Sequence, residues 1–222
     1  MIQIKKKYIM AKIEHYPFLG LFHGDKKIDK EGGILNKNTN LSIITSFTEK
    51  DKAILARQLE KSGIDYINAA SEVTEFVKAF KPRYYAEALE NVNTEYVLIM
   101  DSYDTIINSI DDISSCLEEY GKDMLYAAWK THFPTYFDID FSVPQDNNKK
   151  YINSGVFFGK TSAVKEFYNA LSSYIESEYE NSNDWLKDFE QYWIYKFLTE
   201  NEQYLEKLGI DYNETLVENK DI

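Results

Sequence analysis

The sequence contains very little cysteine, proline or glycine. Its 222 residues include one Cys, four Pro and nine Gly. The single cysteine, Cys116, excludes an internal disulfide framework and a cysteine-rich zinc site. A chain without disulfides is typical of a reducing compartment such as the cytoplasm. Because 44% of the residues are hydrophobic, the composition also excludes collagen-like and low-complexity chains. It indicates an ordered globular protein.

Basic residues and long apolar runs are scarce as well. There are 25 Lys and Arg against 37 Asp and Glu, which gives a net charge of −12. A surface this acidic repels phosphate backbones, so nucleic acid and anionic membranes are not expected as partners. No segment approaches the ~18 apolar residues of a membrane span, and Met1–Ala11 lacks the apolar run of a signal peptide. We expect no membrane span and a cytoplasmic location, or attachment to a membrane by something else.

From residue 41 onward the sequence alternates between patterns typical of strands and of helices. Strands are predicted at Leu41–Phe47, Ile64–Ile67 and Tyr96–Met100, and helices at residues 51–61, 72–80, 84–91 and 189–198. The strand segments are short, apolar and rich in β-branched residues, as in a sheet buried on both faces. This order predicts an α/β fold with a mostly parallel central sheet flanked by helices. In such sheets ligands bind beyond the carboxyl ends of the strands.

Residues 1–40 show little periodicity and end in a polar stretch. We therefore expect an N-terminal extension over residues 1–40 and one folded domain over residues 41–222.

Two carboxylates follow the most apolar predicted strand. Asp101 and Asp104 stand three residues apart at its carboxyl end. Oxygen ligands of this kind suit Mg²⁺ or Mn²⁺, and a cation would let an acidic protein hold an anionic donor such as a diphosphate. The alternative is that Asp101 caps a following helix and Asp104 lies in its first turn.

Two further polar clusters lie downstream. Asn153, Ser154 and Gly155 predict a polar turn before an apolar strand that ends at Gly159, and the glycine would let a ligand approach the backbone closely. Glu190-Gln191 opens an acidic and aromatic helical segment. These acids either interact with the helix dipole or face a sugar.

The order of these three elements resembles a known family. Tyr96–Ile107, Tyr151–Gly159 and Glu190-Gln191 together are similar to the glycosyltransferase domain of the procollagen lysyl hydroxylase and collagen galactosyltransferase group, which has a GT-A-type fold that binds nucleotide sugars. The resemblance spans roughly residues 41–213. It implies a glycosyltransferase that uses Mn²⁺, or Mg²⁺, to move a sugar from a UDP-sugar donor to a glycan or protein acceptor.

The resemblance also implies roles for individual residues. Asp101 and Asp104 would bind the metal ion, and Glu190 or Asp188 would be the catalytic base. Tyr103 would stack on the uracil beside Thr45, while the other donor-binding positions would line the sugar pocket. The implied donor-binding residues are Thr45, Tyr103, Phe133, Asn153, Ser154, Gly155 and Gln191.

The sequence departs from the family at the third metal ligand. The family supplies a histidine beyond its last strand, whereas His15, His23 and His132 all lack that context. A water, another carboxylate, His132 from a loop, or a ligand beyond Ile222 in a truncated domain would have to fill the position.

Two other functions stay open, the first because of this departure and the second because Asp pairs after strands also occur in phosphate-transferring enzymes. One is a catalytically silent module that binds nucleotide sugars or glycans, and the other is a phosphotransferase or nucleotidyltransferase. The irregular segment Thr131–Gln145 is predicted to be a mobile lid or a surface loop.

Overall fold

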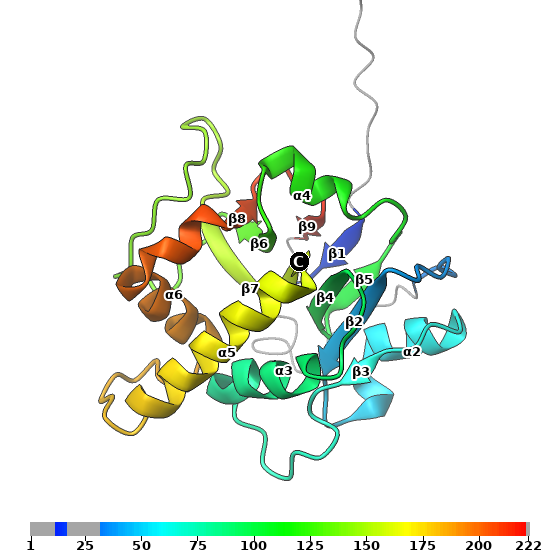
Figure 1. Cartoon of the computed structure of the whole chain (residues 1–222), viewed down its shortest axis with the longest axis horizontal. Coiled ribbons are helices and arrows are strands. Elements are labelled where there is room, and N and C mark those ends of the chain that lie inside the picture. The colour runs from blue at the N-terminus through cyan, green and yellow to red at the C-terminus, as the bar shows by residue number, and fades with distance from the viewer. Residues whose placement is uncertain (1–11, 17–31, 221–222) are drawn as a thin grey trace, which may run out of the picture.

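The computed structural model describes residues 12–16 and 32–220, and its core is a six-stranded sheet. The strands are β2 (Leu41–Ser46), β3 (Ile67–Asn68), β4 (Tyr96–Asp101), β6 (Met124–Trp129), β7 (Tyr151–Lys160) and β8 (Leu208–Asp211). Their order across the sheet is β3-β2-β4-β7-β6-β8 (Figure 1). Only β7 runs antiparallel to its neighbours. The predicted α/β fold with a mostly parallel sheet is confirmed.

Helices cover both faces of this sheet. They are α2 (Ile54–Lys61), α3 (Lys81–Leu89), α4 (Ser115–Tyr120), α5 (Thr161–Glu178) and α6 (Glu190–Glu200), with short 3₁₀ helices η1 (Lys50–Lys52), η2 (Lys78–Phe80) and η3 (Glu202–Glu206). Ile44 and Phe157 pack in one cluster with residues of α3, α5 and α6. Ile43 and Phe158, their neighbours along the strands, pack in another cluster with residues of α2 and α4. Side chains of consecutive strand residues point to opposite faces, so β2, β4, β6 and β7 contribute residues to both clusters.

A second sheet joins the two ends of the described chain. It consists of β5 (Thr105–Ile107), β1 (Ile13–His15) and β9 (Val217–Asn219), in that order. β1 is antiparallel to β5 and parallel to β9. Part of the segment expected as an N-terminal extension is thus a central strand, which places the carboxyl ends of β1 and β9 side by side.

The outer edge of β5 is closed by a side chain. Gln58 of α2 donates from Nε2 to the carbonyl oxygen of Ile107 at 2.6 Å and accepts from the Ile107 N–H at 3.0 Å. The buried amide therefore makes the two hydrogen bonds that a further strand would make.

Several local predictions were wrong. The strand expected at 64–67 is confined to Ile67–Asn68, and residues 72–80 form turns and η2 rather than a regular helix. α3 begins at Lys81 with Pro82 in its first turn, where a missing N–H costs nothing. The expected Asn153–Gly155 turn lies inside β7, opposite a register shift between Tyr126 and Ala127 of β6.

The helix-capping interpretation of the two aspartates was also wrong. Asp101 is the last residue of β4, and Asp104 directly precedes β5, so the acidic turn connects two strands. No helix begins there to be capped.

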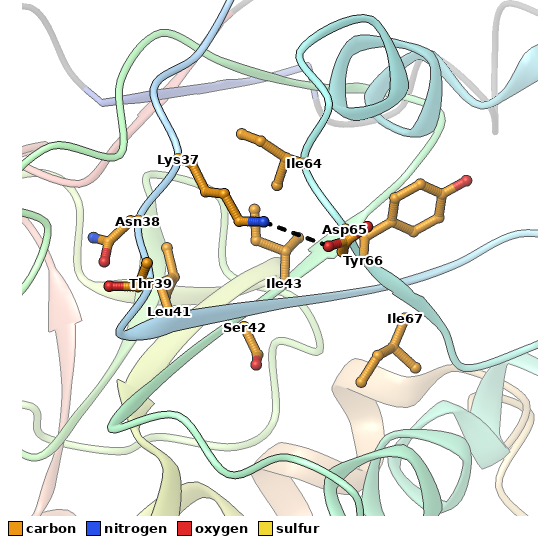
Figure 2. Close-up of a pocket in the computed structure, with 10 residues that line it drawn as sticks. All are labelled: Lys37, Asn38, Thr39, Leu41, Ser42, Ile43, Ile64, Asp65, Tyr66 and Ile67. Carbon is orange, nitrogen blue, oxygen red and sulfur yellow. Dashed lines mark ion pairs between the residues drawn. The ribbon is translucent and has the colours of Figure 1, made fainter.

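Among the described helices, none is long and apolar enough to cross a membrane. A hollow of about 300 Å³ opens at the amino end of β2, between the start of that strand and residues 64–67 (Figure 2). Lys37 Nζ lies 3.6 Å from Asp65 Oδ2 across it. Since Ser46, at the other end of β2, pairs with Asp101, the hollow is separate from the acidic turn.

Candidate metal centre

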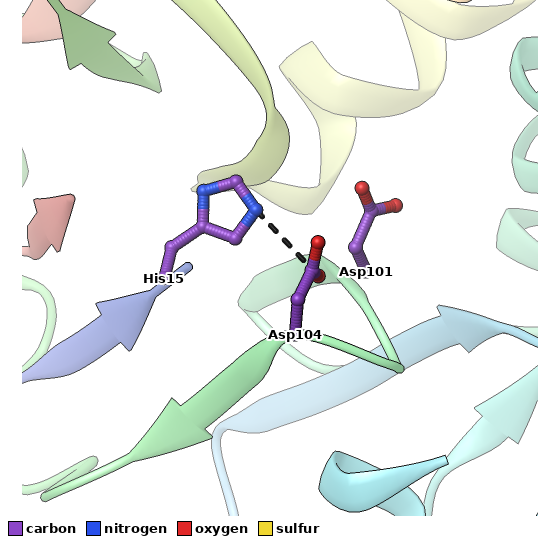
Figure 3. Close-up of side chains that lie close together, drawn as sticks. All are labelled: His15, Asp101 and Asp104. Atoms are coloured by element: carbon purple, nitrogen blue, oxygen red, sulfur yellow. Dashed lines mark ion pairs between the residues drawn. The ribbon is translucent and has the colours of Figure 1, made fainter. Parts of the chain in front are cut away.

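His15, Asp101 and Asp104 point toward one another at the carboxyl ends of β1 and β4 (Figure 3). Each offers one ligand atom, and these atoms all lie within 4.8 Å of one another. His15 Nε2 is 3.6 Å from Asp104 Oδ1. One imidazole nitrogen and two carboxylate oxygens thus surround a common point.

A hydrogen-bond chain fixes the orientation of the His15 ring. Its Nδ1 lies 2.9 Å from Asn219 Oδ1, and because an amide oxygen only accepts, Nδ1 is the donor. Asn219 is fixed in turn, since its Nδ2 donates to the carbonyl oxygen of Ala128 at 2.6 Å. In the neutral ring Nε2 then carries the lone pair, as a metal-binding histidine requires.

Two atoms of this cluster are buried without a hydrogen-bond partner among the described residues, His15 Nε2 and Asp104 Oδ1. Burying a polar atom is costly unless something satisfies it. Burial is the largest influence on the pKa of His15 and lowers it, but Asp104, Asp101 and Asn219 together raise the pKa above its ordinary value. A divalent cation at the common point would satisfy both atoms, and the mixed nitrogen and oxygen donors suit Mn²⁺ better than Mg²⁺. The residues fit the implied metal ion.

Gly155 makes room for the histidine. A Cβ atom at this position would lie 2.4 Å from both Cε1 and Nε2 of His15. The close approach predicted for this glycine therefore exists, but the group that approaches is the His15 ring.

A buried lysine joins the acidic turn to the start of α6. Lys81 Nζ lies 2.5 Å from Asp101 Oδ1 and 2.8 Å from Glu190 Oε2, and the Lys81 and Glu190 side chains are only 9% and 5% exposed. Burial lowers the pKa of Lys81, but the two carboxylates raise it well above its ordinary value. Burial raises the pKa of Glu190 to about 7, although Lys81 opposes this rise. The Lys81 ammonium group thus forms ion pairs with both carboxylates, that of Asp101 and that of Glu190.

Neither His15 nor Lys81 was predicted as a site residue. His15 stands in a segment without periodicity, and Lys81 was interpreted only as part of a helix break before Pro82. The one available signal was the unassigned third metal ligand, a position that a histidine fills in the family that the sequence resembles. His23 lies outside the described residues. His132 stacks on Tyr151, with ring centroids 4.2 Å apart, and is not in the cluster.

Two predicted donor-binding residues lie at the same edge of the sheet and make structural hydrogen bonds. Thr45 is buried, and its Oγ1 donates to the carbonyl oxygen of Met100 at 2.7 Å. The Tyr103 hydroxyl accepts from the N–H groups of Thr48 and Glu49 at 3.0 and 3.1 Å. Tyr103 therefore fixes the loop that follows β2.

Two other predicted residues, Ser154 and Phe133, are linked through a third, Gln191. Its Oε1 accepts from the N–H of Ser154 at 3.2 Å, and its Nε2 donates to the carbonyl oxygen of Phe133 at 2.6 Å. The Asn153 side chain instead accepts from the N–H of Gly155 at 2.9 Å. Gln191 therefore ties β7 and α6 to residues 130–150, which contain neither helix nor strand.

Asp188 lies apart from these contacts. Its side chain is exposed, and its Oδ1 accepts from the Tyr179 hydroxyl at 2.6 Å, just beyond the end of α5. Of the two predicted catalytic carboxylates, only that of Glu190 is connected to the candidate metal ligands, because Lys81 pairs with both Glu190 and Asp101.

Comparison with known proteins adds one loose likeness. No protein-family model and no curated protein sequence matches the chain. Matching solved structures include 4-diphosphocytidyl-2C-methyl-D-erythritol synthase from Anaerococcus prevotii DSM 20548, at 19% sequence identity and a TM-score of 0.39. The match covers 76% of this chain and 68% of that one. A likeness of this extent assigns no activity to the chain.

Proposed function

We propose that the protein is a metal-dependent glycosyltransferase that moves a sugar from a UDP-sugar to a glycan or protein acceptor. The convergence of His15, Asp101 and Asp104 at the carboxyl end of a parallel strand, with two buried ligand atoms unpartnered, carries the proposal. The resemblance to the glycosyltransferase domain of the collagen-modifying enzymes supports it, because that family implies metal ligands at Asp101 and Asp104.

The metal ion would act on the leaving group. Held by His15, Asp101 and Asp104, it would supply a Lewis acid that offsets the negative charge of the departing diphosphate. The chain itself carries a net charge of −12, so without this centre its field would repel a diphosphate.

Glu190 is the acid–base group that the geometry favours over Asp188. Lys81 holds its carboxylate beside Asp101 at 2.8 Å, and a pKa of about 7 places its proton exchange near neutral pH. A general base works best when its pKa lies near the working pH. The side chain of Asp188 is exposed, and one of its oxygens already accepts a hydrogen bond from the Tyr179 hydroxyl.

The donor would lie between Tyr103 and Gln191. The nucleoside would bind beside Tyr103 and Thr45, after β2 and β4. The sugar would lie toward Asn153, Ser154 and Phe133. Gln191 anchors the loop of Phe133 to β7, which supports a role for this loop in keeping water away from the reacting donor.

The test is to incubate the protein with Mn²⁺ and a panel of UDP-sugars and to measure UDP release. We expect release that is lost in Asp104→Ala and in His15→Ala. Asp65→Ala is the matched control, because this aspartate side chain is 99% exposed and lies at the opposite end of β2, so release should be unchanged.

Two outcomes would overturn the proposal. Metal-dependent binding of a UDP-sugar, with no release in the presence of any acceptor, would indicate a silent binding module. Release of phosphate or pyrophosphate from simple nucleotides, without sugar transfer, would indicate a phosphotransferase or nucleotidyltransferase.

A further inference from the structure

Two exposed aromatic residues near the start of α6 are linked through Asp184. Among the described large hydrophobic residues, Trp185 is 76% exposed and Tyr136 is 53% exposed, and only Ile34, at 66%, is comparable. The Tyr136 hydroxyl donates to Asp184 Oδ2 at 2.7 Å, and Asp184 directly precedes Trp185. Tryptophan is usually largely buried, so a 76% exposed indole next in sequence to the carboxylate that holds a second exposed aromatic residue suggests a binding role.

The turn that carries Trp185 is held on both sides. Asp184 Oδ1 accepts from the N–H of Leu186 at 2.9 Å, and the Leu186 side chain is buried. The indole N–H of the buried Trp193 donates to the carbonyl oxygen of Lys187 at 2.6 Å. Trp185 is therefore presented to solvent by a fixed backbone.

The same segments connect this aromatic pair to the candidate active site. The ring of Tyr136 contacts that of Tyr192 on α6, with centroids 6.5 Å apart. Phe133, three residues earlier, packs edge-on against Phe189 at 5.8 Å and accepts a hydrogen bond from Gln191. The aromatic pair and the Glu190-Gln191 dipeptide therefore share one loop and one helix start.

We propose that Trp185 and Tyr136, with the Asp184 carboxylate between them, bind a neutral glycan that is the acceptor of the transfer. That this glycan is the acceptor of the transfer rests on the proposed function, whereas glycan binding by these residues does not. A sugar ring offers C–H groups to a flat aromatic face and hydroxyl groups to a carboxylate at its edge. Exposed rings separated by a fixed carboxylate match both features.

A neutral glycan fits this surface better than a protein or an anionic polymer. The net charge of −12, with the Asp184 carboxylate at the Tyr136 hydroxyl, disfavours acidic partners. A stable protein interface buries about 800 Å² on each partner around an apolar core. Two rings separated by a carboxylate do not provide such a core.

Tryptophan fluorescence gives a direct test. Trp129 and Trp193 are buried, so quenching by acrylamide reports mainly on Trp185. Maltohexaose, cellohexaose and chitohexaose are added in turn, with EDTA and without donor. We expect at least one of them to shield Trp185 from the quencher. Calorimetry then measures its affinity for the variants.

The variants separate a binding role from a structural one. Trp185→Ala and Tyr136→Phe should each weaken binding of that oligosaccharide, the first by tenfold or more. Ile34→Ala is the matched control, because it removes an equally exposed hydrophobic side chain elsewhere and should leave the affinity unchanged. Asp104→Ala should lose Mn²⁺ binding and keep oligosaccharide binding.

These outcomes distinguish the two proposals. Oligosaccharide binding without UDP release would support this inference and overturn the proposed transfer. If no oligosaccharide shields Trp185, the inference is overturned, whether or not UDP release occurs. It is also overturned if Trp185→Ala abolishes self-association measured by light scattering, because the rings would then form an interface between protein chains.

Discussion

The imidazole of His15 occupies the space that a Cβ atom on residue 155 would need. The ideal Cβ position lies 2.4 Å from Cε1 and Nε2 of the ring, so Gly155→Ala must displace His15. We expect Mn²⁺ affinity to fall by about tenfold or more, as when the support of a metal ligand is disturbed. Electron paramagnetic resonance of free Mn²⁺ measures this. Gly33→Ala is the control, because nothing lies within 4 Å of its added Cβ. Equal Mn²⁺ affinity of the two variants would contradict the placement of the His15 ring against Gly155.

Asn219 positions His15 without touching the metal point. Its Oδ1 accepts from His15 Nδ1, so Asn219→Ala frees the ring to rotate and to change tautomer. Loss of such a partner typically weakens metal binding by about 10- to 100-fold. Calorimetric titration with Mn²⁺ should show a loss in this range for Asn219→Ala and none for Asn213→Ala, whose side chain bonds Glu119. A purely structural role would lower the melting temperature and leave the affinity of the folded protein intact.

Lys81 lies between two carboxylates, so its removal should be costly. In Lys81→Met the half-buried Asp101 carboxylate and the buried Glu190 carboxylate lose their shared partner. Breaking a buried pair on one side typically costs about 3–5 kcal/mol of unfolding free energy, which urea denaturation measures. Lys37→Met breaks the exposed pair with Asp65 and should cost at most about 1 kcal/mol. Adding Glu190→Gln to Lys81→Met should restore part of the lost unfolding free energy, because the unpaired buried charge is removed. If none of it is restored, Lys81 does not act as the partner of Glu190.

Glu190 predicts a pH dependence of stability. Its carboxyl group has an ordinary pKa of 4.5, and burial raises this pKa to about 7 in the folded protein. Between these values the folded protein keeps a proton that the unfolded chain has released, so the unfolding free energy falls as the pH rises. The loss amounts to at most about 3 kcal/mol. Urea denaturation from about pH 4.5 to about pH 7 should show this slope, and Glu190→Gln should flatten it. Asp188→Asn, at an exposed carboxylate, should not.

Cys116 should react slowly in the folded protein. Burial raises the pKa of its thiol to about 11, so at pH 8 roughly one molecule in a thousand carries the reactive thiolate. Labelling with an aromatic disulfide reagent should be slow in buffer and fast in concentrated urea. Labelling of the native protein at the rate of a small free thiol would show that α4 opens readily.

The sequence predicted those parts of the site that depend on local order. Asp101 and Asp104 follow an apolar strand within four residues, so their place at the carboxyl edge of the sheet follows from strand direction. The parallel sheet was also predicted from local order, because strand and helix patterns alternate along the sequence. Both signals lie within one short stretch of chain.

The other half of the cluster depends on contacts between distant segments. β1 has only three residues, and its partners begin at Thr105 and Val217. No local pattern predicts such a strand, because three residues are too few for an alternation of apolar and polar residues to be recognised. Lys81 was missed because a lysine beside a proline normally marks an exposed helix start. Its burial depends on Asp101 and Glu190, which lie far away in the sequence.

The pairing of β1 with β9 has a consequence for biosynthesis. Asn219, which orients His15, is translated 204 residues after it. A growing chain can fold its parallel sheet while the histidine still lacks its partner. The candidate metal centre therefore lacks its oriented histidine until Asn219 has been translated, so nascent chains that stop before Asn219 should bind Mn²⁺ more weakly than chains that contain it.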